Sequence, residues 1–500
     1  MTEPTLKKRY LVKLMASLVS GIVSIIMVAI IPKAVGPIAY GQLVYIQQFF
    51  TKVMSFLDAS SSIAFFTKLS ANSKRKQLIG WYGFYSLVLL VSLLGFFYIS
   101  NLLNFNEYVL PGISIEYIYL GISFAFLTWF SQVCTKVGDA FALTVPVEGI
   151  KVIYKLVSLC ALLGLIGCFS LTIKIYLYFQ TITLIVFITC VLFFLLKEGV
   201  ICSKAFSCDF EGFKYTLSEF FSYCKPLFFY STMTLLVGLF DIWILQKSSG
   251  SLQTGYYGLS YSLAAMCFIF TGAMTPIITR EFSRSFELSD ITGMANTFRR
   301  YIPMLFSIAA YFSIFISFQS ENVLTIFTDE EFKGAQLVLM VMAFYPIHQT
   351  YGQLSGSIFY ATGQTKLYCN IGLFSMLLGL ILTVLFVWVF NLGALGLAAK
   401  MLITQLIGVN VQLFFNSKLL GLKLIYFLKH QICVIISFSF IAYASSVYVV
   451  MYSPLTNFLL SGFIYTLFIM LIVLLFPKLF SLTRSELINT IMKMTTASTK

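Results

Sequence analysis

Long apolar runs separated by short polar connections make up most of this chain. A transmembrane helix needs about 20 consecutive, mainly apolar residues, and fourteen runs come close to that length. They lie at 10–31, 42–66, 79–103, 115–135, 143–168, 174–196, 222–246, 256–279, 301–318, 336–361, 367–390, 393–416, 431–451 and 455–476. The pattern predicts an all-α polytopic membrane protein with about 14 transmembrane helices, and its short connections leave no room for an extramembrane domain.

The composition excludes a soluble globule. Hydrophobic residues make up 59% of the 500 positions and charged residues only 10%, whereas a soluble domain carries about 25% charged residues. The same apolar content excludes a disordered chain. The net charge of +14 comes from basic residues in short loops between apolar runs. We therefore attribute it to membrane topology and anionic lipid head groups, and expect no nucleic-acid partner.

Basic residues divide unevenly between the two sets of loops. If the N-terminus and every second loop are assigned to the cytoplasm, that set holds 25 Lys and Arg residues, and the outer loops hold 4. Because positive charge is enriched in cytoplasmic loops, we expect both termini in the cytoplasm. Lys7-Lys8-Arg9 precede about 22 apolar residues, which is too long for a signal peptide and predicts a retained first span.

The chain also shows traces of an internal duplication. A Tyr-Gly pair, Tyr40-Gly41, follows the first span, and a second pair, Tyr257-Gly258, follows the seventh. Duplicated six-span halves around a central site are a common transporter architecture. We therefore expect an N-terminal six-helix lobe over 1–220, a C-terminal six-helix lobe over 221–420, and an extra helix pair with a cytoplasmic tail over 421–500.

Five short motifs resemble those of one family of exporters and occur in the same order. They are Ile31–Gly41, Asp241 with Gly255-Tyr256-Tyr257-Gly258, Phe327–Ala335, Ala361–Lys366 and Leu392–Ala399. Through them the chain resembles the Wzx-type polysaccharide or O-antigen flippases, which share a superfamily with MATE drug exporters and lipid II flippases. One departure is Ile242, which stands where the family has Arg. The last two spans, 431–476, resemble those of longer members and of lipid II flippases.

This resemblance implies a function and its setting. It implies an alternating-access flippase for undecaprenyl-diphosphate-linked oligosaccharide repeat units, used in the synthesis of O-antigen, capsule or exopolysaccharide. The expected location is the bacterial cytoplasmic (inner) membrane, and the expected partners include a polyprenyl-linked glycan as the substrate and the membrane lipids. The polysaccharide polymerase and chain-length proteins of the same pathway are the expected protein partners. Neither an enzymatic activity nor a cofactor is expected.

Charged residues inside the spans are the first candidates for substrate contact. A lysine at mid-span costs about 2.5–3.5 kcal/mol on insertion scales, so it should face an aqueous cavity or a partner. In span two, Gln48, Lys52 and Asp58 lie in or beside a polar stripe with helical spacing. We interpret this stripe as a cavity wall whose cation binds a diphosphate or an acidic sugar. The alternative is that Lys52 and Asp58 serve helix packing.

Three further residues carry predictions of the same kind. Asp241 in span seven is the candidate coupling residue for a proton or cation, or a partner of Lys52; the alternative is a structural hydrogen bond. Lys400 in span twelve faces either the cavity or a neighbouring helix. Lys155, with Glu148 and Lys151 on one face of span five, either binds phosphate or extends to the membrane interface.

Two rival functions remain open at this stage. A MATE-like antiporter of cations or drugs should have an acidic cavity, whereas the spans hold slightly more lysines than carboxylates. A membrane polymerase or glycosyltransferase of the same pathway would need acidic, His or Arg groups on sizeable outer loops. The sequence shows no such constellation, no Cys/His metal cluster and no Gly-rich loop for ATP.

Overall fold

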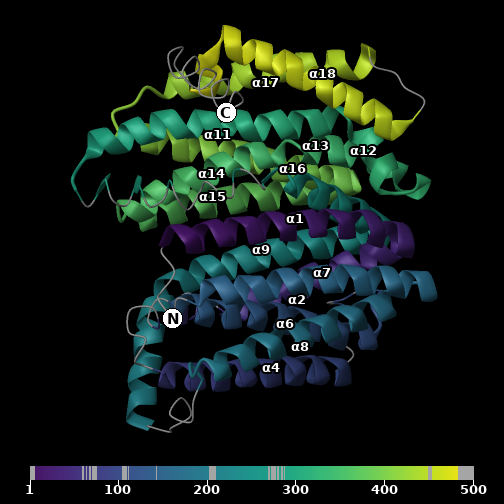
Figure 1. The fold of residues 1–500 in the computed structure, drawn as a ribbon, viewed down its shortest axis with the longest axis vertical. Helices are drawn as coiled ribbons and strands as arrows, with labels where there is room; N and C mark the ends of the chain where they lie inside the picture. The colour runs from purple at the N-terminus through teal and green to yellow at the C-terminus, as the bar shows by residue number, and fades with distance from the viewer. Residues whose placement is uncertain are drawn as a thin grey trace, which may run out of the picture. The chain divides into compact units, whose positions relative to one another are not determined.

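The fold is described from a computed structural model (Figure 1). The residues it describes are 6–58, 61–62, 65–66, 69, 76–103, 108, 110, 112–141, 143–201, 210–268, 271, 278, 281–282, 285–286, 288–448 and 453–481. Within these residues every regular element is a helix. Most of the predicted cytoplasmic loop 67–78 falls outside the described residues, and so do residues 202–209 of the predicted loop 197–221.

The helices of the first part of the chain follow the predicted spans closely. They are α1 (Leu6–Val35), α2 (Pro37–Asp58), α4 (Gln77–Leu102), α6 (Ile115–Ala140), α7 (Thr144–Cys168), α8 (Ile173–Lys197) and α9 (Phe210–Ala265). The largest difference is in α9, which begins at Phe210 rather than near 222 and continues through the expected connection between the seventh and eighth spans. Gly250 interrupts its helical backbone with a φ of 77°, which glycine adopts without steric cost.

The second part of the chain shows the same agreement, with two local irregularities. Its helices are α11 (Ile291–Phe318), α12 (Ser320–Phe327), η2 (Glu330–Ala335), α13 (Gln336–Met342), α14 (Tyr345–Ala361), α15 (Thr365–Thr383), η3 (Val384–Val389), α16 (Gly393–Leu419), α17 (Leu424–Tyr448), α18 (Pro454–Leu475) and η4 (Pro477–Phe480). The predicted tenth span, 336–361, is divided into α13 and α14 just before Pro346. The eleventh ends in the π-helical turn η3.

The length and apolarity of these helices confirm an all-α polytopic membrane protein. Nine of the described helices are long and apolar enough to cross a membrane. They are α4, α6, α7, α8, α11, α15 with η3, α16, α17 and α18. Many of their large apolar side chains are exposed, as expected where lipid rather than water is the solvent.

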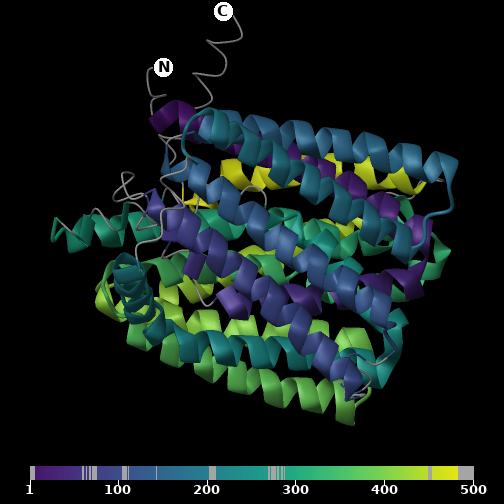
Figure 2. The ribbon, with the colours of Figure 1, turned by 90° about the horizontal axis from the view of Figure 1, so that it is seen from below.

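The chain forms two compact units, 1–255 and 256–500. In the first unit α6 packs against α2, α4 and α8, and α7 packs against α1 and α8. In the second, α16 packs against α13, α14 and α15, and α17 and α18 pack beside α11 and α12. The long helices of each unit run side by side in both views (Figures 1 and 2). The division into lobes at 220 and 420 stays a prediction.

A close helix crossing joins α2 to the later part of α9 in the first unit. A Cβ on Gly41 would lie 1.7 Å from the Ser251 carbonyl oxygen, and a Cβ on Gly255 would lie 2.5 Å from the Pro37 carbonyl oxygen. Two backbones approach this closely only where side chains are absent. The Tyr-Gly motif after the first span therefore has a packing role at this crossing.

Candidate functional site

Lys52 lies half-buried on α2 and contacts α9. Its Nζ donates a hydrogen bond to the Gly238 carbonyl oxygen at 2.5 Å. Gly238 also leaves room for the lysine, because a Cβ there would lie 3.0 Å from Nζ and 3.3 Å from Cδ. The predicted span-two cation is therefore placed against a second helix of the same unit.

Asp241 lies three residues after Gly238 on α9 and is half-buried. Residues three apart on a helix have Cβ atoms roughly 5–6 Å from each other. The Asp241 side chain therefore starts within one turn of the Lys52 ammonium. Pairing of Asp241 with Lys52 and a coupling role for Asp241 both stay predictions.

Gln47 and Gln48 are both half-buried on α2. Gln47 Nε2 donates to Gln180 Oε1 on α8 at 2.7 Å, whereas Gln48 is half-buried one turn before Lys52. Beside Lys52, Thr51 is exposed. Part of the predicted polar face of α2 is thus accessible, and the substrate contact of Gln48 stays a prediction.

Asp58 lies in a hydrogen-bonded network at the end of α2. Its carboxylate accepts bonds from the Ser61 hydroxyl at 3.0 Å, from the Ser62 backbone N–H at 2.9 Å and from the Ser62 hydroxyl at 2.8 Å. Tyr82 on α4 donates to the same carboxylate at 3.3 Å, and Lys136 Nζ on α6 donates to the Ser62 hydroxyl at 2.8 Å. These contacts favour the packing interpretation of Asp58, which ties three helices together.

The sequence alone does not predict the contact that Lys136 makes in this network. Lys136 follows the predicted span 115–135, and the structure places it on α6, which continues to Ala140. Only the fold brings it beside residue 62, which is 74 positions away. Several charged residues follow Cys134 in the sequence, but their spacing does not predict which residues they contact.

Lys400 is buried on α16, with 8% of its surface exposed. Its side chain lies against α15, where a Cβ on Gly379 would be 2.9 Å from Lys400 Cε and 3.4 Å from Nζ. Further along the same helix, a shallow and open groove of about 400 Å³ is lined by apolar residues and one amide. The lining residues are Leu406, Ile407, Asn410, Val411 and Phe414.

Lys155 is half-buried on α7. The other two residues of its predicted face are paired: Lys151 Nζ lies 3.4 Å from the Glu148 carboxylate, and Glu148 is buried. Lys155 follows Lys151 by one helical turn. The pair accounts for Glu148 and Lys151, and phosphate binding by Lys155 stays a prediction.

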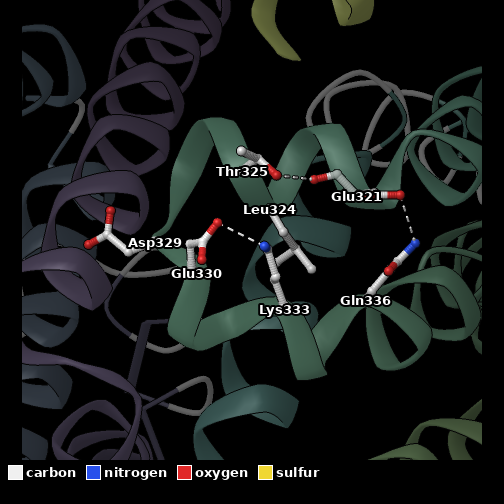
Figure 3. Close-up of a pocket in the computed structure, with 7 residues that line it drawn as sticks. All are labelled: Glu321, Leu324, Thr325, Asp329, Glu330, Lys333 and Gln336. Carbon is white, nitrogen blue, oxygen red and sulfur yellow. Dashed lines mark hydrogen bonds and ion pairs between the residues drawn. The ribbon is translucent and has the colours of Figure 1, made fainter. Parts of the chain in front are cut away.

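A small polar pocket in the second unit gathers most of the acidic residues of 319–335 (Figure 3). Lys333 Nζ binds the Glu330 carboxylate at 2.8 Å, and Gln336 Nε2 donates to Glu321 Oε2 at 3.4 Å. The ammonium of Lys333 lowers the pKa of Glu330. Asp329 points away from these pairs in Figure 3. The pocket is lined by no His or Arg.

Among the residues that the structure describes, no group of three or more His, Cys, Asp or Glu side chains is arranged to hold a metal ion. The described acidic residues in or beside the spans have other surroundings instead. Asp58 is hydrogen-bonded and Glu148 is paired with Lys151.

Several solved structures are similar in fold to this chain. A lipid II flippase, MurJ, in an inward closed conformation matches with a TM-score of 0.68 and 13% identity, over 93% of this chain and 98% of that chain. An inward-facing multidrug resistance MATE transporter of the MOP superfamily matches with a TM-score of 0.58 and 14% identity, over 84% and 96%. This chain therefore shares the fold of these two proteins, which is called the MOP fold below.

A third match of this fold differs in its pocket. It is a MOP superfamily transporter from Pyrococcus furiosus, described as having a binding pocket of reversed polarity, with a TM-score of 0.54 and 16% identity over 82% of this chain and 92% of that chain. No family model matches the chain, and no curated protein matches it. The likeness to these proteins is therefore one of fold, and the charge of the site depends on this chain's own residues.

Proposed function

We propose that this protein is a flippase that carries polyprenyl-diphosphate-linked oligosaccharide repeat units across the bacterial cytoplasmic membrane by alternating access. The observation that carries the proposal is Lys52, an ammonium inside a predicted span of a chain with the MOP fold. Charge at that depth is costly and marks a substrate path by default. A lysine in contact with a diphosphate gains a charge-assisted hydrogen bond.

The second unit supports the same substrate class. Its helix α16 carries both a buried lysine, Lys400, and the apolar groove over Leu406–Phe414. A lipid-linked sugar diphosphate has a negative head group and a long hydrocarbon tail. A cation and an apolar groove on one helix fit these two parts, and the surface glycan pathways that use such lipids would supply the substrate.

The rival function is a MATE-like antiporter of cationic compounds. Such a protein needs carboxylates that are available to the cargo. Asp58 instead accepts hydrogen bonds from its own helix end and from Tyr82, and Glu148 pairs with Lys151. The charges of this chain therefore favour an anionic cargo. An enzyme of the same pathway has the weaker case, because the outer acidic pocket is lined by no His or Arg.

Transport in proteoliposomes tests the proposal. The purified full-length chain is reconstituted with a fluorescent polyprenyl-diphosphate oligosaccharide, and a membrane-impermeant quencher reports the fraction that reaches the outer leaflet. We expect translocation above that of protein-free vesicles and of vesicles with Lys52→Glu. Transport of an organic cation such as ethidium, without movement of the lipid-linked sugar, would instead identify the antiporter.

A further inference from the structure

Lys155 lies near the middle of α7, a helix that is long and apolar enough to cross a membrane. It follows Thr144, the first residue of the helix, by eleven positions. A rise of about 1.5 Å per residue places it about 16 Å along the helix, and the apolar core of a membrane is about 30 Å thick. The four-carbon stem of Lys155 is therefore too short to carry its ammonium to either membrane interface.

Lys155 also lies on the packed face of α7. The buried residues Glu148, Ser158 and Leu162 are seven positions before it, three after it and seven after it, and residues at these spacings share one side of a helix. The large exposed apolar residues of α7 lie on the other side and are Ile153, Leu156, Val157 and Leu163. Lys155 is half-buried, so part of its side chain remains accessible on the side of α7 that faces the protein.

The ammonium of Lys155 has no counter-charge among the residues that the structure describes. Lys52 and Lys136 each donate a hydrogen bond to a residue of another helix, whereas Lys155 has neither a hydrogen bond nor an ion pair within the described part of the chain. The charge that acts on it is a second ammonium, that of Lys151 one turn earlier. The Glu148 carboxylate pairs with Lys151 instead.

An unpaired ammonium on the packed face of a membrane helix is unfavourable. Buried charges are stable when they are paired with an opposite charge, and like charges four positions apart on a helix repel each other. An anion bound at Lys155 would satisfy its charge and offset the repulsion from Lys151. Phosphate oxygens are strong acceptors for an ammonium, because bonds between two charged partners are roughly twice as strong as neutral ones.

The depth of Lys155 distinguishes between two sources of phosphate. The phosphate of a resident phospholipid stays in the interfacial region outside the apolar core. The head group of a flipped lipid, in contrast, has to cross the middle of the membrane. A cation at mid-depth on the packed face of a helix therefore fits the transported head group, and charges at this depth mark substrate paths by default.

We propose that Lys155 binds the diphosphate of the lipid-linked substrate as the head group passes the middle of the membrane. The inference rests on the proposed function, and it adds a second cation, besides Lys52, to the path of the head group in the first unit. The ammonium is a compact charge with three donors on a flexible stem, so it can stay in contact with a phosphate that moves. Lys151 contributes less, because Glu148 offsets its charge.

Binding to the purified full-length chain in phosphatidylcholine nanodiscs tests this contact. Undecaprenyl diphosphate is the anionic probe, undecaprenol is its uncharged control, and a second set of nanodiscs contains phosphatidylglycerol as an anionic phospholipid. Lys155→Met removes the charge at similar length, and Lys155→Arg keeps it. Lys174→Met is the matched control, because Lys174 is an exposed lysine at the start of α8 that pairs with Glu116 at 2.7 Å. The unfolding temperature of each variant is measured without ligand.

We expect Lys155→Met to bind undecaprenyl diphosphate about tenfold more weakly than the wild type, because a hydrogen bond between charged groups is lost. Its affinity for undecaprenol should be unchanged. Lys155→Arg should retain most of the affinity for the diphosphate, and Lys174→Met should match the wild type. Because Lys155→Met removes an unpaired charge from a packed face, it should unfold at the same temperature as the wild type or at a higher one.

The inference and the proposed function fail in different ways. If the wild type binds the diphosphate and Lys155→Met binds it equally well, Lys155 is not a contact, while the proposed function stands. A loss of affinity for undecaprenol as well, or a lower unfolding temperature, would assign Lys155 to packing. If phosphatidylglycerol removes the difference between Lys155→Met and the wild type, the residue binds a resident phospholipid. If the wild type does not bind the diphosphate more tightly than undecaprenol, the proposed function is overturned, and this inference with it.

Discussion

Lys400 on α16 lies over Gly379 of α15, at a place where a Cβ would come within 2.9 Å of the lysine Cε. Lys52 on α2 has the same relationship with Gly238 on α9. Each of these two lysines inside a predicted span is accommodated by a glycine on a neighbouring helix. The missing side chain leaves room for the aliphatic stem, so an ammonium can be held at a fixed position within a helix pair.

Filling the space at Gly379 should therefore displace Lys400. We expect Gly379→Val to reduce translocation of the lipid-linked sugar several-fold, because its branched side chain overlaps the lysine stem, and Gly379→Ala to have a smaller effect. Export measured at matched protein level reports the loss. Gly164→Ala on α7, a position with open space around it, serves as the control. Equal export by Gly379→Val and the wild type would show that the position of Lys400 is unimportant.

The crossing at Gly41 makes a prediction about stability. A Cβ there would lie 1.7 Å from the Ser251 carbonyl oxygen, and a backbone atom cannot rotate out of the way. Overpacking of this kind costs about 1–3 kcal/mol, so Gly41→Ala should lower the thermal unfolding temperature of the solubilised protein. Gly95→Ala should leave it unchanged or raise it, because alanine favours helix over glycine. An unchanged unfolding temperature for Gly41→Ala would contradict the packing at this crossing.

The sequence predicted the spans well and the pairings poorly. Apolar runs of about 20 residues leave little alternative to a membrane helix, so the predicted ranges agree with most helices to within a few residues. Partners of polar residues depend instead on which helices become neighbours. Lys136 meets Ser62 across 74 residues, and Lys400 meets Gly379, although neither contact leaves a periodic signal in the chain.

In the candidate site, too, the sequence predicted the important residues better than their contacts. The sequence singles out Lys52 because a charge within an apolar run is conspicuous, and for the same reason it singles out Asp241 in a later span. It could not show that Lys52 bonds to the Gly238 carbonyl. For Asp58 the charge alone suggested a cavity, whereas bonds from Ser62 and Tyr82 explain it as packing. Helical spacing predicts which face of a helix a residue occupies, but it does not predict which residue on another helix it contacts.

The charge pattern of the loops makes a prediction about topology. Both termini and the loops 67–78, 197–221, 280–300 and 417–430 should lie in the cytoplasm. Single cysteines at positions 75 and 290, in a background without native cysteines, should react with an impermeant thiol reagent only after the cells are opened. Labelling at either position in intact cells would rule out the fourteen-span arrangement.

Asp241 carries the prediction about energy coupling. If its carboxylate takes up a proton or cation during the cycle, Asp241→Asn should insert normally and bind the lipid-linked sugar, yet lose the response to an imposed ion gradient. Transport into proteoliposomes with and without a pH or sodium gradient measures this response. A variant whose transport still follows the gradient as the wild type does would restrict Asp241 to a structural role beside Lys52.

The charge at position 52 gives the sharpest test of the substrate class. An ammonium contacts phosphate as a point charge, so Arg should replace it in part, whereas Ala removes the charge and Glu reverses it. We expect export to fall in the order wild type, Lys52→Arg, Lys52→Ala, Lys52→Glu. Arg ranks below the wild type because its larger head group has to fit beside Gly238, where a Cβ would already lie 3.0 Å from the lysine Nζ. Surface glycan is measured in a strain that lacks the native gene, with the amount of membrane-inserted protein matched between variants. Wild-type export by Lys52→Glu would mean that no anion contacts this residue, and the role of Lys52 would then be to pack α2 against α9.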